Sequence, residues 1–165
     1  MEALQRIETK IKDTQNLILP STKESAEQTE KVILALGDYM KVTAHCCVGG
    51  KSIEEDLNRF NHGTQVISGT QGRVYDMIQR KTFKTKNLKM LIIDEFNEKL
   101  SKGFKEQVGD INRYLPVNTQ NVVVSTTFPE NVLEMTARFM TENTVKVLVK
   151  GSKISLERLN NFIST

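Results

Sequence analysis

Apolar residues along the chain form short continuous runs, and between the runs they recur at helical spacing. The runs that predict strands are residues 16–19, 42–48, 65–70, 89–94, 121–126 and 145–149. The segments that predict helices are residues 2–13, 21–40, 52–60, 72–80, 95–114 and 129–140. Strands that are apolar on both faces and alternate with helices are typical of a mostly parallel sheet with helices on both faces. The pattern predicts an α/β domain over residues 1–150, followed by a linker or tail over residues 151–165.

Two of the predicted helices carry an apolar stripe at steps of three and four residues. The stripe positions are Leu4, Ile7 and Ile11 in the first helix and Ile33, Leu36 and Met40 in the second. Ser21 or Thr22 stands where the second helix begins, and either side chain is suited to cap the free backbone N–H groups there. The stripes predict which helical faces pack against the sheet.

Composition narrows the class of protein. The 165 residues are 38% hydrophobic and 26% charged, with three prolines, which is typical of a globular domain. A net charge of +3 permits an anionic partner such as RNA but lies well below that of a basic nucleic-acid-binding arm. No apolar run approaches the length of a membrane span, and residues 1–12 lack the apolar core of a signal peptide. We expect a cytoplasmic or nuclear location and no membrane partner.

The two cysteines, Cys46 and Cys47, are adjacent on a predicted strand. Their side chains should point to opposite faces of the sheet, so a disulfide between them is disfavoured. Free thiols fit a reducing compartment. His45 stands beside them, but no second cluster of ligands at zinc spacing exists in the sequence, which disfavours a zinc site.

Ligands of open parallel sheets bind beyond the carboxyl ends of the strands. Five loops hold such positions, at residues 20–24, 49–52, 69–73, 94–97 and 125–127. The candidate chemistry of the chain is therefore expected in these five loops.

The fourth of these loops begins with two acids, Asp94 and Glu95, which end the most apolar strand. A carboxylate pair there can hold Mg²⁺ through water and orient an attacking water at a phosphate. Acids also cap helices at strand ends, so the pair alone does not decide between the two roles. Serine and cysteine nucleophile motifs and paired histidines are missing from the sequence, which leaves hydrolysis of those types without candidate residues.

Three loops carry groups suited to a phosphate backbone: glycines that expose backbone N–H groups, hydroxyls, and basic side chains at helix starts. The residues are Thr22 and Lys23 in the first loop, Gly49 and Gly50 in the second, and Thr70, Gly72 and Arg73 in the third. Each loop alone is also compatible with an ordinary cap or tight turn. Three such loops at one end of a sheet predict a track for the phosphates of single-stranded RNA.

The second loop continues as the sequence GGKS, over residues 49–52. A P-loop needs a further glycine five positions before Gly50, where His45 stands, and a two-glycine turn cannot enclose a triphosphate. A makeshift phosphate site on Lys51 and Ser52 is a weaker alternative.

Taken together, the loops resemble the first RecA-like domain of DEAD-box RNA helicases of the initiation factor 4A family, including its exon-junction branch. The stretches that carry the resemblance are ALGDYMKVTAHCCVGG, GTQGRVYDMI, KMLIIDEFNEKLSKGFKEQ and RYLP. It covers nearly the whole chain. The resemblance implies a RecA-like fold of the P-loop NTPase type, incomplete at the N-terminus, because the family's P-loop and adenine-reading segment would precede residue 1. It also implies Mg-ATP as the cofactor of the family.

The same resemblance implies a role for each loop. The three glycine- and hydroxyl-bearing loops stand where the family contacts RNA. Asp94 and Glu95 stand at the magnesium- and water-activating positions, with Asp94 holding magnesium through water. Ser125 and Thr127 stand at the Ser-Ala-Thr motif, which couples nucleotide state to RNA binding, and Asn97 stands at the acidic position that contacts this motif.

The sequence departs from the family at several of these positions. Phe96 and Asn97 replace the Ala and Asp of the Asp-Glu-Ala-Asp motif, and Thr126 replaces the alanine of Ser-Ala-Thr, which predicts lost coupling. The changes in the RNA loops are Ser21 for proline, Lys23 for arginine and Gln71 for proline. Lys23 and Arg73 keep positive charge, so the substitutions spare the RNA loops better than the ATP machinery.

We therefore expect a degenerate or fragmentary helicase domain that binds single-stranded RNA or helicase partners, such as translation or exon-junction scaffold proteins. On its own it should bind no Mg-ATP tightly. The alternative is a portion of an active ATP-dependent RNA helicase of translation initiation or mRNA processing, with the P-loop and second domain on other sequence. Because the family's P-loop strand normally lies within the sheet, its absence also predicts an exposed strand edge, with reduced stability or self-association through that edge.

Overall fold

A computed structural model describes residues 2–96 and 102–127, with residues 136, 140, 144, 145 and 147. The strands are β1 (Asn16–Leu19), β2 (Ala44–Cys47), β3 (Val66–Gly69), β4 (Met90–Ile93) and β5 (Gln120–Val123). The helices are α1 (Glu2–Gln5), α2 (Lys23–Gly37), the 3-10 turn η1 (Asp38–Met40), α3 (Ile53–His62), α4 (Gln71–Gln79) and α5 (Lys102–Arg113). Most of the helix expected over 129–140 and of the strand over 145–149, and the whole tail over 151–165, lie outside the described residues.

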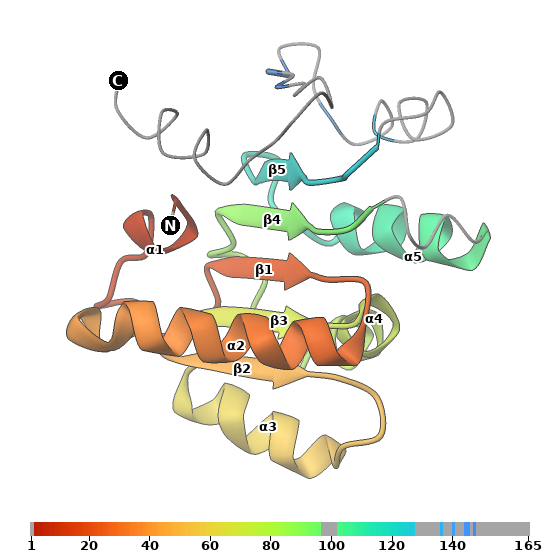
Figure 1. Ribbon diagram of the computed structural model, residues 1–165. Helices are drawn as coiled ribbons and strands as arrows, with labels where there is room; N and C mark the ends of the chain where they lie inside the picture. The colour runs from red at the N-terminus through yellow and green to blue at the C-terminus, as the bar shows by residue number, and fades with distance from the viewer. Residues whose placement is uncertain are drawn as a thin grey trace.

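The five strands form one sheet in the order β2-β3-β1-β4-β5, and every neighbouring pair is parallel. In Figure 1 all the arrows therefore point the same way, and the loops that leave the carboxyl ends of the strands gather along one edge. The predicted α/β fold with a parallel sheet is confirmed, and the first five predicted strands are present. β1 has the predicted bounds, β2, β3 and β4 are one or two residues shorter at each end, and β5 begins one residue earlier and ends three residues earlier than predicted.

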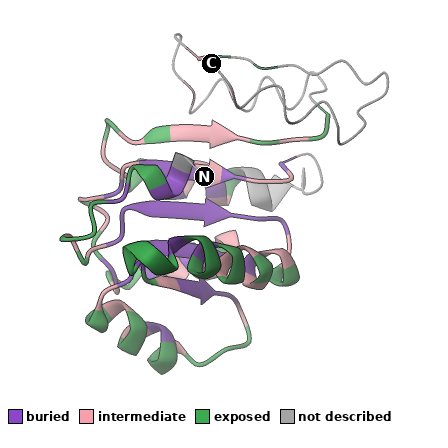
Figure 2. Ribbon diagram, turned by 60° about the vertical axis from the view of Figure 1, so that its left-hand side comes forward, coloured by how far each residue is buried: buried purple, intermediate pink, exposed green. Residues whose placement is uncertain are grey.

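Helices cover both faces of the sheet and build two separate cores. The larger core joins the sheet to α3, α4 and α5; its largest fully buried members include Phe96, Leu17, Leu19, Ile67, Met77, Leu91, Ile93 and Ile111. The smaller core joins the other face to α1 and α2 through Leu4, Ile7, Ile18, Ile33, Val42 and Val66. Figure 2 shows the inner strands buried and the outer faces of the helices exposed. Residues 17 to 19 of β1 therefore alternate between the two cores, as a strand buried on both faces must.

The cysteines lie on opposite faces, as the strand period predicts. Cys47 belongs to the larger core, whereas Cys46 packs with Ala26 and Val48 on the α2 side. Both thiols are free and buried. Burial raises the pKa of Cys46 to about 11, and it raises the pKa of Cys47 further still. Neither thiol is a thiolate at neutral pH, so neither is suited to act as a nucleophile.

The apolar stripe predicted for the second helix is wrong in part. Ile33 is buried, but Leu36 is 51% exposed and Met40 is 37% exposed. The buried positions of α2 are Ala26, Ile33 and Gly37, so the face toward the sheet is rotated from the predicted one. A Cβ atom on Gly37 would lie 2.9 Å from the Cβ of Val42, which shows how closely the helix approaches the start of β2.

The first helix is much shorter than the predicted span of residues 2–13. It ends at Gln5, although Leu4 and Ile7 are buried as the stripe predicts. Beyond Gln5, a side-chain amide makes hydrogen bonds with backbone N–H and C=O groups that would otherwise bond within a helix. Gln15 donates to the carbonyls of Glu8 and Ile11, at 2.9 and 3.0 Å, and its Oε1 accepts from the N–H of Glu8 at 2.8 Å. Apolar periodicity could not reveal this competition.

Strand β5 has a strand neighbour on one side only among the described residues. Its side chains are exposed at Gln120 and half-buried over the rest, unlike the fully buried β1, and Figure 2 shows the difference along the sheet. No helix in the described part of the chain has the length and apolar character that crossing a membrane requires.

A pair of glycine substitutions tests the packing at the carboxyl edge of the sheet. A Cβ atom on Gly69 would lie 2.3 Å from the carbonyl oxygen of Cys47, so Gly69→Ala must push β2 and β3 apart. We expect a loss of about 2 kcal/mol or more in unfolding free energy by urea denaturation. Gly49→Ala is the matched control, because nothing lies within 4 Å of its added atom. Equal stability of the two variants would contradict this packing.

Candidate nucleic-acid interface

The five predicted loops meet at one edge of the sheet. Because β2, β3 and β1 are neighbours, the three loops with phosphate-binding chemistry are contiguous: Gly49 follows β2, Thr70 follows β3 and Thr22 follows β1. The acid pair follows β4, and Ser125 follows β5. These loops lie at the right-hand edge of the sheet in Figure 1.

The sequence left Ser21 and Thr22 as candidates for the N-cap of α2, and the structure shows Thr22 in that position. Its Oγ1 accepts a hydrogen bond from the backbone N–H of Ser25 at 3.0 Å. Lys23 begins the helix and is exposed. Its side chain reaches the neighbouring loop, because a Cβ atom on Gly50 would lie 3.5 Å from the Lys23 Nζ. The first two loops therefore present one positive charge beside a glycine backbone.

The loop after β2 keeps the open backbone that the glycines predict. Gly50 has a φ of 93°, a left-handed conformation that glycine adopts without strain. The two polar side chains of the GGKS sequence have partners within the fold. Lys51 pairs with Glu27 at 3.0 Å, a hydrogen bond that raises the pKa of Lys51, and Ser52 caps α3 by accepting from the N–H of Glu54 at 3.1 Å. Both groups are thus accounted for without a phosphate.

The loop after β3 contains polar groups that the described residues leave unused. Thr70 is the N-cap of α4, yet its side chain makes no capping hydrogen bond. The Oε1 of Gln71 is buried and has no partner within the described part of the structure, which is uncommon for a buried polar atom. Gly72 is exposed beside them. A free hydroxyl and an exposed glycine at a helix start are groups that a phosphate oxygen can use.

Arg73 does not extend freely from this loop. Its Nε donates to Oδ2 of Asp56 at 2.8 Å, and one of its terminal nitrogens, Nη2, donates to the carbonyl of Lys51 at 3.1 Å. Asp56 is fully buried and also lies 2.6 Å from Nε2 of His45. Sequence reasoning singled out Arg73 but missed Asp56, whose signal is weak because Asp56 is the third of three consecutive acids in the first turn of α3.

The acid pair is held in one defined geometry. The N–H of Asp94 donates to the carbonyl of Leu19 at 3.1 Å, and Oδ1 of Asp94 accepts from the N–H of Glu95 at 2.9 Å. Glu95 has a φ of 53°, a left-handed conformation that is strained for a residue with a side chain. Its carboxylate accepts a hydrogen bond from the hydroxyl of Ser21, so the loop after β1 and the acid pair are in direct contact.

Phe96 explains part of this geometry. Its ring is fully buried in the larger core, and its N–H donates to the carbonyl of Val124 at 3.2 Å. Asn97 lies outside the described residues. In the last loop, Ser125 Oγ donates to the carbonyl of Thr127 at 2.6 Å. The structure thus brings the acid pair and the β5 loop together through Phe96.

The two carboxylates fit the protein's share of a magnesium site. Mg²⁺ is held in nucleotide sites by one or two carboxylates, with waters and phosphate oxygens completing the shell. Asp94 and Glu95 are adjacent and half-buried, and the described residues contain no group of three or more metal-ligating side chains. When bound, magnesium would neutralise phosphate charge, and Asp94 would be the residue to hold it through water.

A five-stranded parallel sheet with helices on both faces and an acid pair at its carboxyl edge is the architecture of a RecA-like domain. A sequence model of the family described as DEAD/DEAH box helicase matches residues 1–135. The chain belongs to that family.

Its relatives are close in sequence. It is 52% identical over 158 residues to eukaryotic initiation factor 4A-3 of Nicotiana plumbaginifolia, and 53% identical over 159 residues to the ATP-dependent RNA helicase FAL1 of Yarrowia lipolytica. Each alignment covers 96% of this chain and 40% of the relative. The chain therefore spans about 40% of the length of these curated relatives.

Solved structures agree with the fold. A DEAD box protein from Methanococcus jannaschii superposes with a TM-score of 0.79 at 27% identity, covering 84% of this chain and 38% of that one. S. cerevisiae Dbp5 bound to RNA and ADP BeF3 gives a TM-score of 0.74 at 28% identity, covering 88% of this chain and 37% of that one. The RecA-like fold expected from the sequence is confirmed.

The contact between Ser21 and Glu95 can be tested by a double-mutant cycle. Ser21→Ala removes a donor to a half-buried carboxylate, so we expect a loss of about 1.5 kcal/mol in unfolding free energy. In a Glu95→Ala background the same change should cost much less, because the acceptor is already gone. Glu95→Gln keeps an acceptor oxygen and serves as the matched control. Additive losses in the cycle would contradict the contact.

Proposed function

We propose that this chain binds the backbone of single-stranded RNA through the three loops that follow β1, β2 and β3. The observation that carries the proposal is their placement side by side at the carboxyl edge of the sheet. The groups assigned to RNA are the side chains of Lys23 and Thr70, the helix start at Thr22, and the backbone at Gly49, Gly50 and Gly72, of which Gly50 and Gly72 are exposed. Binding is weak and independent of sequence, with a dissociation constant on the order of 10⁻⁴ to 10⁻⁶ M at physiological salt.

We further propose that these 165 residues alone do not hydrolyse ATP or hold Mg-ATP tightly. They contain no sequence with P-loop spacing, and the loss of even one preorganised donor to a transition state costs about 3 kcal/mol. One contact in the structure and two sequence differences favour the same conclusion. Glu95, at the water-activating position, is bonded to Ser21, and Asn97 and Thr126 replace residues of the coupling motifs, so RNA binding should not respond to nucleotide.

A second candidate is a portion of an active ATP-dependent RNA helicase that works in translation initiation or mRNA processing. The intact Asp94 and Glu95 pair and the 40% span of the curated relatives favour it. The P-loop and the second domain would then be encoded by adjoining sequence. Sequencing the transcript upstream of residue 1 separates the two candidates, since an encoded P-loop favours the helicase.

The partners proposed are single-stranded RNA and the translation or exon-junction scaffold proteins that helicases of this family bind. A cytoplasmic or nuclear location follows from these partners.

Self-association through the edge of β5 is a further proposal, because that strand is partly exposed and has one described neighbour. Sedimentation across a range of concentrations tests it, and a monomer at all of them would overturn it.

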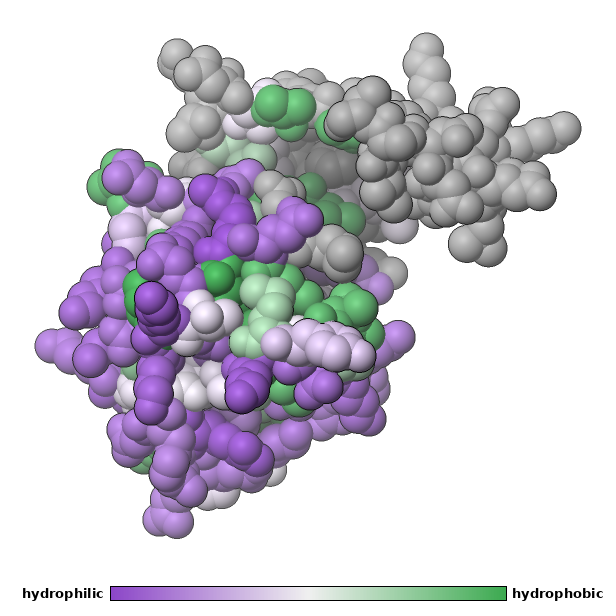
Figure 3. Space-filling model, turned by 90° about the vertical axis from the view of Figure 1, so that its left-hand side faces the viewer, coloured by the Kyte–Doolittle hydropathy of each residue, from purple (hydrophilic) through white to green (hydrophobic). Residues whose placement is uncertain are grey.

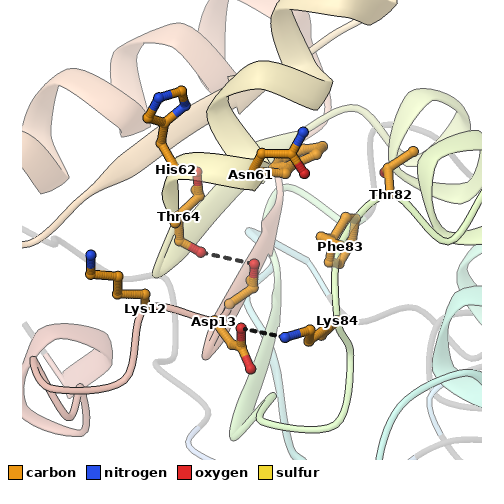
Figure 4. A pocket seen from close by; sticks show the side chains of 11 residues that line it. Lys12, Asp13, Asn61, His62, Thr64, Thr82, Phe83 and Lys84 are labelled. Atoms are coloured by element: carbon orange, nitrogen blue, oxygen red, sulfur yellow. Dashed lines mark hydrogen bonds and ion pairs between the residues drawn. The ribbon is translucent and has the colours of Figure 1, made fainter.

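Fluorescence anisotropy of a labelled single-stranded RNA tests the proposed function directly. We expect the logarithm of the association constant for RNA to fall linearly with the logarithm of the salt concentration. Lys23→Ala should weaken it and lower the slope by about one unit. Lys84→Ala is the matched control: Lys84 is 68% exposed and lies at the opposite edge of the sheet, beside a cavity also lined by Lys12 and His62 (Figure 4).

The same titration is repeated with Mg²⁺ and ATP. We expect unchanged RNA affinity and no phosphate release, because the nucleotide machinery is incomplete in these residues. ATP-dependent tightening would favour the helicase alternative. Absence of RNA binding, or an equal effect of the Lys23 and Lys84 variants, would overturn the proposed interface.

A further inference from the structure

We propose that Arg73 serves RNA binding as a positioning residue, which together with Asp56 and His45 fixes the spacing between the loop after β2 and the loop after β3. This inference rests on the proposed function and deepens it. It gives Arg73 a role different from the phosphate contact that its sequence suggests, and it adds Asp56 and His45, which no loop motif contains.

Asp56 is the centre of this arrangement. It lies in the first turn of α3, and its side chain is completely buried. A buried carboxylate is tolerated when it is paired and hydrogen-bonded. Here Oδ1 lies 2.6 Å from Nε2 of His45, Oδ2 accepts from Nε of Arg73 at 2.8 Å, and the thiol of Cys47 lies 3.7 Å from Oδ2. The carboxylate therefore has partners on β2 and on α4.

The His45 ring is fixed by packing as well as by its hydrogen bond to Asp56. It is buried and packs edge-on against Phe60 of α3, with ring centroids 5.6 Å apart. An ionised carboxylate can only accept hydrogen bonds, so the Nε2 of His45 is the donor. Strand β2 and helix α3 are thereby joined at a fixed distance on either side of the loop over residues 48–52.

Arg73 extends the connection to the second loop. Besides its bond to Asp56, its Nη2 donates to the carbonyl oxygen of Lys51 at 3.1 Å. Lys51 adjoins Gly50, and Arg73 adjoins Gly72. One guanidinium thus fixes the backbone next to Gly50 and Gly72, two of the three glycines to which the RNA backbone is assigned. Parallel pairing of β2 with β3, with Cys47 opposite Gly69, brings the two loops together, and Arg73 then holds them.

A direct phosphate contact by Arg73 conflicts with this geometry. The Arg73 side chain is only 11% exposed. Rotating it toward solvent would leave the buried charge of Asp56 with one partner fewer, and removing one partner of a buried ion pair is strongly destabilising. A lysine at the same place would keep the charge but lacks the planar fork that reaches both Asp56 and the Lys51 carbonyl.

The difference between positioning and phosphate contact is measurable with Arg73→Lys. We expect RNA affinity to fall about tenfold, as for other couplings that act through a second residue. The slope of the logarithm of the association constant against the logarithm of salt concentration should stay unchanged, because no phosphate contact is lost. If Arg73 contacts phosphate instead, the lysine should retain most of the affinity. Arg73→Ala should then lower the slope by about one unit. That pair of results would overturn the proposal.

The matched control is Arg80→Lys. Arg80 lies at the C-terminal end of the same helix and pairs with Asp76 at 2.9 Å, but it is 53% exposed. It should leave RNA affinity and slope unchanged. Urea denaturation of all variants separates a positioning effect from general unfolding; an Arg73→Lys variant that loses stability but binds RNA normally would make the role of Arg73 purely structural and overturn the proposal.

Amide hydrogen exchange without RNA keeps the test independent of RNA binding. We expect Arg73→Lys to speed exchange at Gly50, Lys51 and Gly72 while β1 and β4 remain protected. If the unmodified chain binds no RNA, the proposed function fails, yet this exchange pattern still reports whether Arg73 joins the loops. If these three amides exchange at the same rate in the unmodified chain and in Arg73→Lys, Arg73 does not join the two loops and the proposal is overturned.

Discussion

The parallel direction of all five strands is the constraint on which the rest of the structure depends. Because every strand ends at the same edge, loops from residues 20 to 127 meet there although they are distant in sequence. The strand order then sorts them: β2, β3 and β1 place together the three loops that we propose bind RNA, and β4 places the acid pair beside them. The face at the opposite ends of the strands is largely hydrophilic (Figure 3) and carries none of these loops.

The sequence predicted the five described strands, the parallel sheet and an N-cap at Ser21 or Thr22, because apolar runs and capping residues act locally. Its errors lie where side-chain hydrogen bonds and tertiary packing determine the structure. The first helix ends early because Gln15 bonds the backbone after it, and Leu36 is exposed because α2 turns Ala26 and Gly37 toward the sheet. The partner of Arg73 could not be predicted, since Asp56 approaches it only through tertiary folding.

The positions where the chain departs from its family have structural consequences. A proline cannot donate a hydrogen bond, whereas Ser21 donates to Glu95 and so joins the loop after β1 to the acid pair. Phe96 fills the larger core where the family has a smaller alanine. Both residues help to hold Glu95 in its strained conformation. Under the proposed function, the loops keep positive charge for RNA while their connection to nucleotide is altered.

The most direct test of this account is an amide chemical-shift titration of the chain with single-stranded RNA. The account predicts shifts at Thr22, Lys23, Gly50 and Thr70 that fit one dissociation constant, with the opposite edge unaffected. Shifts centred on the cavity lined by Lys12, His62 and Lys84, or different constants for the three loops, would contradict it.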